Sequence, residues 1–387
     1  MNGEKKILTT HAGSLPRPDS LVELYAKRGN GERIDDNNLA AESEWATRWV
    51  VEKQADIGID IPSNGEQSRE AFFLYLQRRL TGFSGRWDRP AASELNDYPE
   101  FKAYRDKALK ERIAVSNFKP PIAKSAISYS NLEANMEELR LFKDAIDKHS
   151  NTFADAFITA PSPGIVAKAM KNEYYSNEEE YLDALANALV VEYRNAIDAG
   201  FILQIDAPDL ALERHISFHD KPLSEFLKFI DGVIKRINWM IKGLPSDRVR
   251  LHVCYGNYES PHDRDVALEH ILPHLLEARV GGFLFPFANP RHQHEIKLFR
   301  KHTLTSNQYL IVGAIDTLST FVEHPEVVAD RIEMAVECIG DAHRVMAGTD
   351  CGFDTSAGMG RLTTDVVWAK LAALKKGAEI AEKRLFC

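Results

Sequence analysis

Short runs rich in β-branched and aromatic residues alternate along this chain with longer stretches whose apolar residues recur at helical spacing. Strands separated by helices of this length form repeated βα units around a parallel sheet. Several short runs lack alternation of polar and apolar residues, which is typical of strands buried on both faces. Eight runs qualify as strands and predict an α/β protein with a closed (β/α)₈ TIM barrel: residues 6–11, 59–64, 156–161, 201–206, 248–255, 282–288, 308–316 and 344–352.

The stretch from 70 to 130 is less regular than the rest of the chain and contains several glycines and prolines. We predict one barrel over residues 1–387, with a short N-terminal extension and with residues 70–130 inserted after the second strand. Residues 123–129 would make a ninth strand, which we assign to a hairpin within the insertion. A separate small domain is the alternative. Helices are expected at residues 38–57, 176–199, 223–241, 266–278, 325–339 and 364–383.

Composition and charge exclude several kinds of protein. Hydrophobic residues make up 44% of the chain and charged residues 27%, which is ordinary for a globular protein. The net charge of −9, without a cluster of lysines and arginines, argues against binding to nucleic acid. No apolar run approaches the roughly 20 residues that span a bilayer, and the first residues lack the apolar segment of a secretory signal. We expect a cytoplasmic protein that binds neither nucleic acid nor membranes, and leave open whether it forms a homo-oligomer.

Polar residues of the kinds that bind ligands recur at the ends of the predicted strands. In a parallel barrel the carboxyl ends of all strands open onto one face, where active sites lie. His11 and Asp316, which end the first and seventh strands, are therefore candidate catalytic residues. The other strand ends supply further candidates: Gly13, Ser14, Glu66, Thr159, Asp206, His252, Cys254, Asp350 and Cys351.

His252 and Cys254 form the most specific pair among these candidates. Residues i and i+2 of a strand project to the same face, so the imidazole and the thiol point together. Cys351 ends the eighth strand at the same mouth of the barrel. Two thiolates and an imidazole suit Zn²⁺, and three protein ligands with one open position are typical of a catalytic zinc site. The alternative is that the two cysteines are simply buried and that His252 is a core histidine. Cys338, within a predicted helix, and Cys387, at the terminus, are expected to have no role in the site.

A zinc ion bound by two cysteinates would be a modest Lewis acid, better suited to keeping a substrate thiol as its thiolate. A thiolate attacks an electrophilic carbon, so this site favours S-alkylation over hydrolysis. Glu66 and Asp206 could receive a cationic amine, and the backbone around Gly13 and Ser14 could hold a carboxylate. The alternative for either acidic residue is a salt bridge with a loop arginine such as Arg17.

Five motifs follow one another along the chain: Thr-Thr-His-Ala-Gly-Ser-Leu-Pro-Arg at 9–17, Gly-Ile-Asp at 58–60 with Asn-Gly-Glu at 64–66, Gln-Ile-Asp-x-Pro at 204–208, His-Val-Cys-Tyr at 252–255 and Asp-Cys-Gly at 350–352. In this order they resemble the catalytic half of the cobalamin-independent methionine synthases. The resemblance covers nearly the whole chain. It is closest to the short, single-domain members, which include methionine synthase-like proteins and epoxyalkane:coenzyme M transferases.

The resemblance implies a (β/α)₈ fold and zinc-dependent transfer of a methyl or alkyl group to a thiol. It matches three residues to the zinc ligands: His252, Cys254 and Cys351. It matches three others to the residues that hold the carboxylate and the amine of homocysteine: Ser14, Glu66 and Asp206.

Three differences from the family pattern bear on the fourth zinc ligand and on the donor. Pro286 stands where the family commonly has a glutamate ligand, so the fourth position would fall to water, to substrate, or to His292 or His294. Leu318 replaces a histidine that the full-length synthases use in proton transfer. Residues 159–164 lack the tryptophan that stacks on folate. These differences argue against methyltetrahydrofolate polyglutamate as the donor and leave its identity open.

The leading hypothesis is a zinc-dependent methyltransferase that converts homocysteine into methionine, similar to 5-methyltetrahydropteroyltriglutamate–homocysteine methyltransferase. The second is an S-alkyltransferase that joins another thiol, such as coenzyme M, to an epoxide or another electrophile. Its sulfonate would need a cationic residue, for which Arg17, Arg69 or Arg291 is available. The third is a non-catalytic homologue that binds zinc or a small molecule, because Pro286 cannot ligate a metal.

Overall fold

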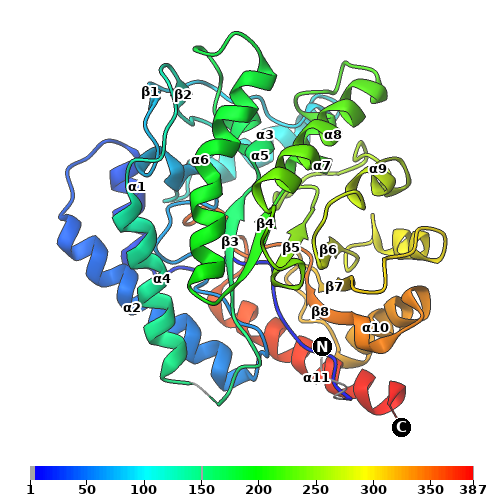
Figure 1. The fold of residues 1–387 in the computed structure, drawn as a ribbon. Coiled ribbons are helices and arrows are strands. Elements are labelled where there is room, and N and C mark those ends of the chain that lie inside the picture. The colour runs from blue at the N-terminus through cyan, green and yellow to red at the C-terminus, as the bar shows by residue number, and fades with distance from the viewer. Residues whose placement is uncertain (1–4, 150, 387) are drawn as a thin grey trace.

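The structure, a computed structural model, describes residues 5–149 and 151–386, and Cys387 lies outside the described residues. Six parallel strands form most of the barrel wall, each paired with the next along the chain (Figure 1). The last four strands end earlier than predicted, and Cys254 and Cys351, which the prediction placed within two of them, lie beyond the strand ends. The strands are β3 (Phe157–Pro161), β4 (Ile202–Asp206), β5 (Val249–His252), β6 (Gly282–Pro286), β7 (Tyr309–Ile315) and β8 (Val345–Thr349).

Two extended segments near the N-terminus close the barrel between β8 and β3. One segment includes Thr9, which bridges to β8, and the other includes Ser63, which bridges to β3. Three backbone hydrogen bonds complete the ring: Thr10 N–H to Ala347 O (2.9 Å), Ile61 N–H to Thr9 O (3.0 Å) and Phe157 N–H to Pro62 O (2.9 Å). The predicted eight-membered barrel is therefore present as six strands and two extended segments.

These closing segments are not regular strands, so the prediction of strands at 6–11 and 59–64 is wrong in this respect. Pro62 has no N–H to donate to a ladder. The Asp60 carboxylate also accepts the backbone N–H of Thr9 at 2.9 Å, so a side chain takes a bond that a strand neighbour would otherwise take. The two closing segments are consequently held by a mixture of backbone and side-chain hydrogen bonds.

Helices cover the outer face of the barrel (Figure 1). The elements that follow the eight barrel segments in turn are α2 (Asp36–Ile57), α4 (Leu132–Asp147), α6 (Glu178–Asp198), α8 (Leu223–Met240), α9 (Leu268–Leu275), the 3₁₀ helix η5 (Gln293–Arg300), α10 (Pro325–Ile339) and α11 (Thr364–Leu385). All six predicted helices are present among them. The other elements outside the insertion are α1 (Asp19–Gly29), α5 (Pro163–Ala169), α7 (Asp209–Leu212), η3 (Glu213–His215), η4 (Ser246–Arg248) and η6 (Ala342–Arg344).

The region predicted as an insertion contains small elements of its own. They are η1 (Leu74–Arg78), β1 (Phe83–Ser84), η2 (Ser93–Asn96), α3 (Pro99–Lys110) and β2 (Ile122–Ala123). β1 and β2 pair antiparallel in a separate two-stranded sheet, and Leu80 bridges to Tyr129 beside them. The run at 123–129 therefore lies outside the barrel ladder, but it forms no hairpin, because η2 and α3 separate the two paired strands along the chain. The boundaries of the insertion at residues 70 and 130 stay predictions. The organisation of the whole chain as a single barrel also stays a prediction.

The inside of the barrel is filled with side chains, as it is in other barrels of this type. A cluster of buried apolar residues comes from five of the strands: Phe157, Ile202, Leu284, Ile311 and Met346. Because the interior is packed, a ligand has room only at a mouth of the barrel. No helix among the described residues has the length and apolarity needed to cross a membrane.

Candidate metal centre and substrate pocket

Three side chains that can ligate a metal meet at the carboxyl face of the barrel. His252 is the last residue of β5, Cys254 follows two residues later, and Cys351 lies two residues beyond the end of β8. The Sγ atoms of Cys254 and Cys351 are 3.6 Å apart, and one ligand atom from each of the three residues lies within 4.8 Å of the others. All three residues are buried. The structure thus brings together the three ligands that the sequence indicates.

The donor set fits a tetrahedral zinc site with one open position. Zn–S bonds of about 2.3 Å at a tetrahedral angle separate two sulfurs by about 3.8 Å, close to the observed 3.6 Å. Within the described residues the cluster has three members. His292 is held by Asp265 (2.9 Å) and Glu295 (2.7 Å), and His294 is exposed, so neither takes the place that Pro286 leaves. An open position is what a catalytic zinc site keeps for its substrate.

Charges within the cluster shift the pKa values of all three candidate ligands, and a bound metal ion would displace the protons that His252 and Cys351 hold. Burial lowers the pKa of His252, but the charges of Cys254 and Asp206 outweigh it and raise this pKa to about 10. The hydrogen bond from Cys351 lowers the pKa of the Cys254 thiol, while that bond and burial raise the pKa of Cys351. The Asp206 carboxylate lies 2.9 Å from Nδ1 of His252, which leaves Nε2 for ligation. An outer carboxylate of this kind orients a ligating imidazole.

The cluster lines a cavity between the mouth of the barrel and the insertion. The segments that end at the mouth contribute Ala12, Ser14, Glu66, Asp206 and Gly352 to its wall. The insertion contributes mainly apolar and cationic residues, among them Phe72, Phe73, Arg105, Leu109 and Phe118. The candidate metal ligands and the candidate substrate-binding residues therefore face one cavity.

Glu66 and Ser14 present polar atoms to this cavity that have no partner in the protein. Glu66 Oε1 accepts the hydroxyl of Thr159 at 2.9 Å, whereas Glu66 Oε2 and Ser14 Oγ are buried without a hydrogen bond. Burial and the charge of Asp206 raise the pKa of Glu66 to about 7, despite the opposing charge of Arg69. The Glu66 backbone is left-handed, with φ of 58°, a conformation whose strain is usual at functional sites. A buried carboxylate oxygen without a partner, close to the charge of Asp206, suits a cationic amine.

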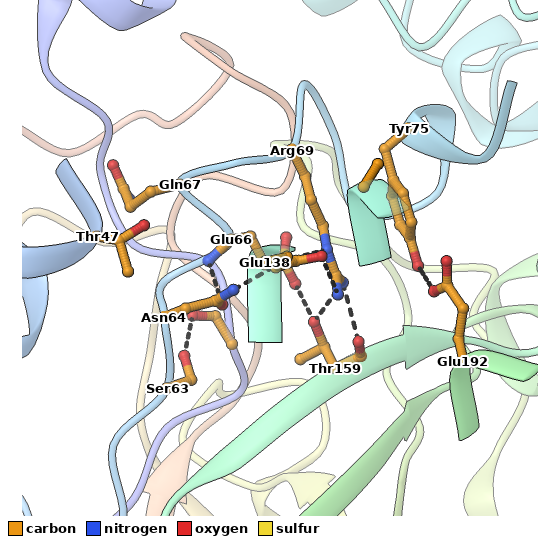
Figure 2. Close-up of polar contacts among 12 residues, drawn as sticks. Thr47, Ser63, Asn64, Glu66, Gln67, Arg69, Tyr75, Glu138, Thr159 and Glu192 are labelled. Atoms are coloured by element: carbon orange, nitrogen blue, oxygen red, sulfur yellow. Dashed lines mark hydrogen bonds and ion pairs between the residues drawn. The ribbon is translucent and has the colours of Figure 1, made fainter. Parts of the chain in front are cut away.

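A buried network holds Glu66 in place (Figure 2). Arg69 donates to Glu138 through Nε at 2.8 Å, and to both oxygens of Thr159 through Nη1 at 2.9 Å. Asn64 donates to Glu138 at 2.8 Å and accepts the backbone N–H of Glu66 at 2.9 Å. Sequence patterns did not indicate Glu138, which lies on α4, 69 residues beyond Arg69.

Glu138→Gln is expected to destabilise the fold by about 3 kcal/mol at neutral pH. Burial raises the pKa of Glu138, but Arg69 and Arg79 outweigh it and lower this pKa to about 2. A carboxylate whose pKa is lowered by folding stabilises the protein above its ordinary pKa of 4.5 and loses this effect as the pH falls toward 2. Urea unfolding at pH 7 and pH 3 should therefore show a smaller difference from wild type at pH 3.

Glu137→Gln is the matched control for this prediction. Glu137 is the neighbouring residue on α4, is half exposed, and pairs with Arg140 on the same helix. Exposed pairs of this kind contribute about 1 kcal/mol or less. Equal losses of stability in the Glu137 and Glu138 variants would contradict the role of the buried network.

His11 does not line the cavity, in contrast to the expectation that it is catalytic. Its Nε2 pairs with Gln54 Oε1 at 2.8 Å, and its Nδ1 accepts the backbone N–H of Gly13 at 3.2 Å. Burial lowers the pKa of His11 to about 3, so the ring is neutral. Gly13 has φ of 126°, and a Cβ there would lie 2.6 Å from Thr159 Cγ2. We interpret His11 as a positioning residue for the turn that presents Ser14.

Asp316 likewise lies outside the wall of the cavity. Its Oδ1 accepts the backbone N–H of Leu318 at 2.9 Å, and its own N–H donates to Glu323. Burial, assisted by the charge of Asp316, raises the pKa of Asp350 to about 7. The position of Asp316 therefore does not support the catalytic role expected from its place at a strand end.

The fold and the site together define a (β/α)₈ barrel with a His-Cys-Cys cluster and an acidic pocket at its carboxyl face. No family model matches the chain. Among curated proteins, it is 25% identical over 387 residues to a methionine synthase from Sulfolobus acidocaldarius, covering 100% of this chain and 95% of that protein. It is 25% identical over 381 residues to a methionine synthase from Thermococcus kodakarensis, with 97% and 94% covered.

Comparison of structures agrees with these sequence relatives. The B12-independent methionine synthase from Shewanella sp. W3-18-1, in complex with selenomethionine, superposes with a TM-score of 0.72 at 22% identity. The match covers 98% of this chain and 99% of that one. The barrel has the fold of a B12-independent methionine synthase, and the chain is a homologue, over its whole length, of proteins named methionine synthase.

Proposed function

We propose that this chain is a zinc-dependent methyltransferase that methylates the thiol of homocysteine and releases methionine. Its full-length homologues are named methionine synthase. The observation that carries the proposal is that the cluster of two cysteines and His252 lines the same cavity as Glu66 and Asp206. A thiol-binding centre and an amine-binding pocket in one cavity suit an amino acid that bears a thiol.

Homocysteine would be held through its amino-acid end. Its ammonium group would lie against Glu66 Oε2 and Asp206, where it offsets the repulsion between the two carboxylates. Its carboxylate would accept the hydroxyl of Ser14, which has no partner in the protein. These contacts bring the raised pKa of Glu66 down, so that both acidic residues are ionised when substrate is bound. The thiol is thereby directed into the part of the cavity lined by Cys254 and Cys351.

Zinc held by His252, Cys254 and Cys351 would supply the positive charge that keeps the substrate sulfur deprotonated near neutral pH. Asp206 orients the His252 ring through its hydrogen bond to Nδ1. The apolar side chains that the insertion contributes to the cavity, such as Phe72 and Phe73, would limit access of water, which would otherwise compete for the electrophile. A bond forms between sulfur and the methyl carbon as the bond from that carbon to the donor breaks. The free thiols also suit the reducing cytoplasm, where we place the protein.

The alternative acceptor, coenzyme M, is less well matched by the site. Its sulfonate needs a cation, but Arg17 is bound to Asp354 at 2.9 Å and Arg69 is bound to Glu138 at 2.8 Å. Arg291 does not line the cavity, and the arginines that do, such as Arg105 and Arg112, come mainly from the insertion. The acidic groups next to the metal cluster therefore favour a thiol with an amine. The open metal position favours a catalytic protein over the third hypothesis, a non-catalytic homologue that only binds zinc or a small molecule.

Proton release on thiol binding tests the choice of acceptor. Zinc-loaded protein should release a proton when it binds homocysteine, because the thiol loses its hydrogen. The matched ligand 4-mercaptobutyrate has the same thiol and carboxylate but no amine, and we expect it to bind about 10- to 100-fold more weakly. Formation of methionine, followed by mass spectrometry, checks the transfer itself. Binding of coenzyme M as tightly as homocysteine would contradict the proposal.

A further inference from the structure

A second group of side chains that can ligate a metal lies outside the wall of the cavity just described. It consists of Glu94 in η2, His215 in η3 and Asp265 in the loop after β5, with their ligand atoms within 4.8 Å of one another. His215 Nδ1 lies 3.2 Å from Asp265 Oδ1, and His215 Nε2 lies 4.0 Å from Glu94 Oε2. Glu94 is 0% exposed and His215 is 2% exposed. The group is therefore shielded from bulk water.

Two atoms of this group are buried without a hydrogen bond. Glu94 Oε1 accepts the hydroxyl of Ser260, but Glu94 Oε2 has no partner. His215 Nδ1 also makes no hydrogen bond, although it lies 3.2 Å from Asp265 Oδ1, while its Nε2 pairs with the Tyr258 hydroxyl at 2.6 Å. A buried carboxylate oxygen left unpaired costs free energy. A cation near Asp265 Oδ1 would provide a partner for both unpaired atoms.

We propose that Glu94, His215 and Asp265 bind a divalent cation at a site separate from the cysteine-containing cluster. Two carboxylates and one imidazole suit ions that accept nitrogen and oxygen donors, such as Mn²⁺. His262 and His292 lie 3.1 and 2.9 Å from Asp265 Oδ2 and hold that carboxylate in place. Partners of this kind orient the ligands of a metal and are part of most such sites.

The position of the group assigns the cation a structural role. Its ligands come from the insertion, from the segment after β4 and from the loop after β5. A bound cation would therefore link the insertion to two parts of the barrel mouth. A neighbouring cavity, lined by Ser93 and His219 as well as by His215 and Asp265, offers a path for entry. Because a ligand that binds only the folded state stabilises it, the ion should raise the melting temperature.

The site can be tested by titrating the metal-free protein with Mn²⁺. The electron paramagnetic resonance signal of the free ion shows how much Mn²⁺ is bound. Thiolates are poor ligands for Mn²⁺, so the probe reports on this group. One tightly bound ion per chain is expected for wild type and for Cys254→Ser. Glu94→Gln and His215→Gln should each weaken binding at least about tenfold. His219→Gln is the matched control and should bind as wild type does.

Thermal unfolding provides a second readout that separates ligand loss from misfolding. Mn²⁺ should raise the melting temperature of wild type and of His219→Gln but not of Glu94→Gln, with unchanged circular dichroism in all three proteins. The proposal is overturned if wild type binds no stoichiometric Mn²⁺, or if Glu94→Gln and His215→Gln bind it as tightly as wild type. Loss of the ion in Cys254→Ser would also overturn it, because the ion would then occupy the sulfur cluster.

Discussion

Cys351→Ser is expected to remove one equivalent of bound zinc and to slow methyl transfer at least about 100-fold. The Sγ atoms of Cys351 and Cys254 lie 3.6 Å apart, so both reach a single ion. A serine hydroxyl stays protonated at neutral pH and is a poorer zinc ligand than a thiolate. His252 and Cys254 alone would leave two ligands where catalytic zinc sites have three. Metal analysis after dialysis, combined with an assay of methionine formation, measures both effects.

Cys338→Ser is the matched control, because Cys338 is a buried free thiol on α10 outside the cluster. This variant should keep the zinc content and the activity of wild type. Cys254→Ser should behave like Cys351→Ser. Full zinc occupancy in either of the two cluster variants would show that the cluster is not the zinc site.

Glu66→Gln is expected to raise the KM for homocysteine about 10- to 100-fold, as the loss of a charge-assisted hydrogen bond predicts. The amine contact is the same in the ground state and in the transition state, so kcat should change much less than KM. Steady-state kinetics at pH 8 give both constants, and direct binding of homocysteine gives an independent value for the affinity.

The same substitution should stabilise the substrate-free protein at pH 8. Burial and the charge of Asp206 raise the pKa of Glu66 from 4.5 to about 7. A carboxyl with a raised pKa stabilises the folded state below its ordinary pKa, and this contribution is lost as the pH rises through 7. At pH 8 wild type holds a buried charge that glutamine lacks, so the variant should be more stable by about 1–3 kcal/mol. Denaturant unfolding at pH 4 should show almost no difference.

Asp209→Asn separates the effect on stability from the effect on binding. Asp209 is buried, and burial raises its pKa to about 7, but it does not line the cavity. Its replacement should increase stability at pH 8 and leave the KM for homocysteine unchanged. An unchanged KM for homocysteine in Glu66→Gln would show that Glu66 does not bind the amine. An equal increase of this KM in Glu66→Gln and Asp209→Asn would show the same.

Local patterns were sufficient to predict the barrel and the metal cluster. In a parallel barrel every strand ends at the same face, so Cys254 and Cys351 could be assigned to one mouth although they lie 97 residues apart. The register of the strands agrees with this assignment, because Asp206 on β4 is paired with His252 on β5. Their side chains consequently meet at the site.

The prediction was less successful where the direction of a side chain depends on a turn. His11 lies at the end of a barrel segment, as a catalytic residue would, but its Nδ1 accepts the backbone N–H of Gly13 in a left-handed turn, and the ring does not line the cavity. Its ring is directed instead toward Gln54, against which it is fully buried. Position at a strand end indicates a face of the barrel, but it does not specify where the side chain points.

Periodicity and the chemistry of strand ends identified the six parallel strands and six of the helices, because both depend on residues only a few positions apart. They did not identify Glu138 as the partner of Arg69, or Glu94 as the neighbour of His215 and Asp265. These groups meet only when the insertion and α4 fold back against the barrel. Such contacts depend on how whole elements pack, and a buried charge is stable only where that packing supplies its partner.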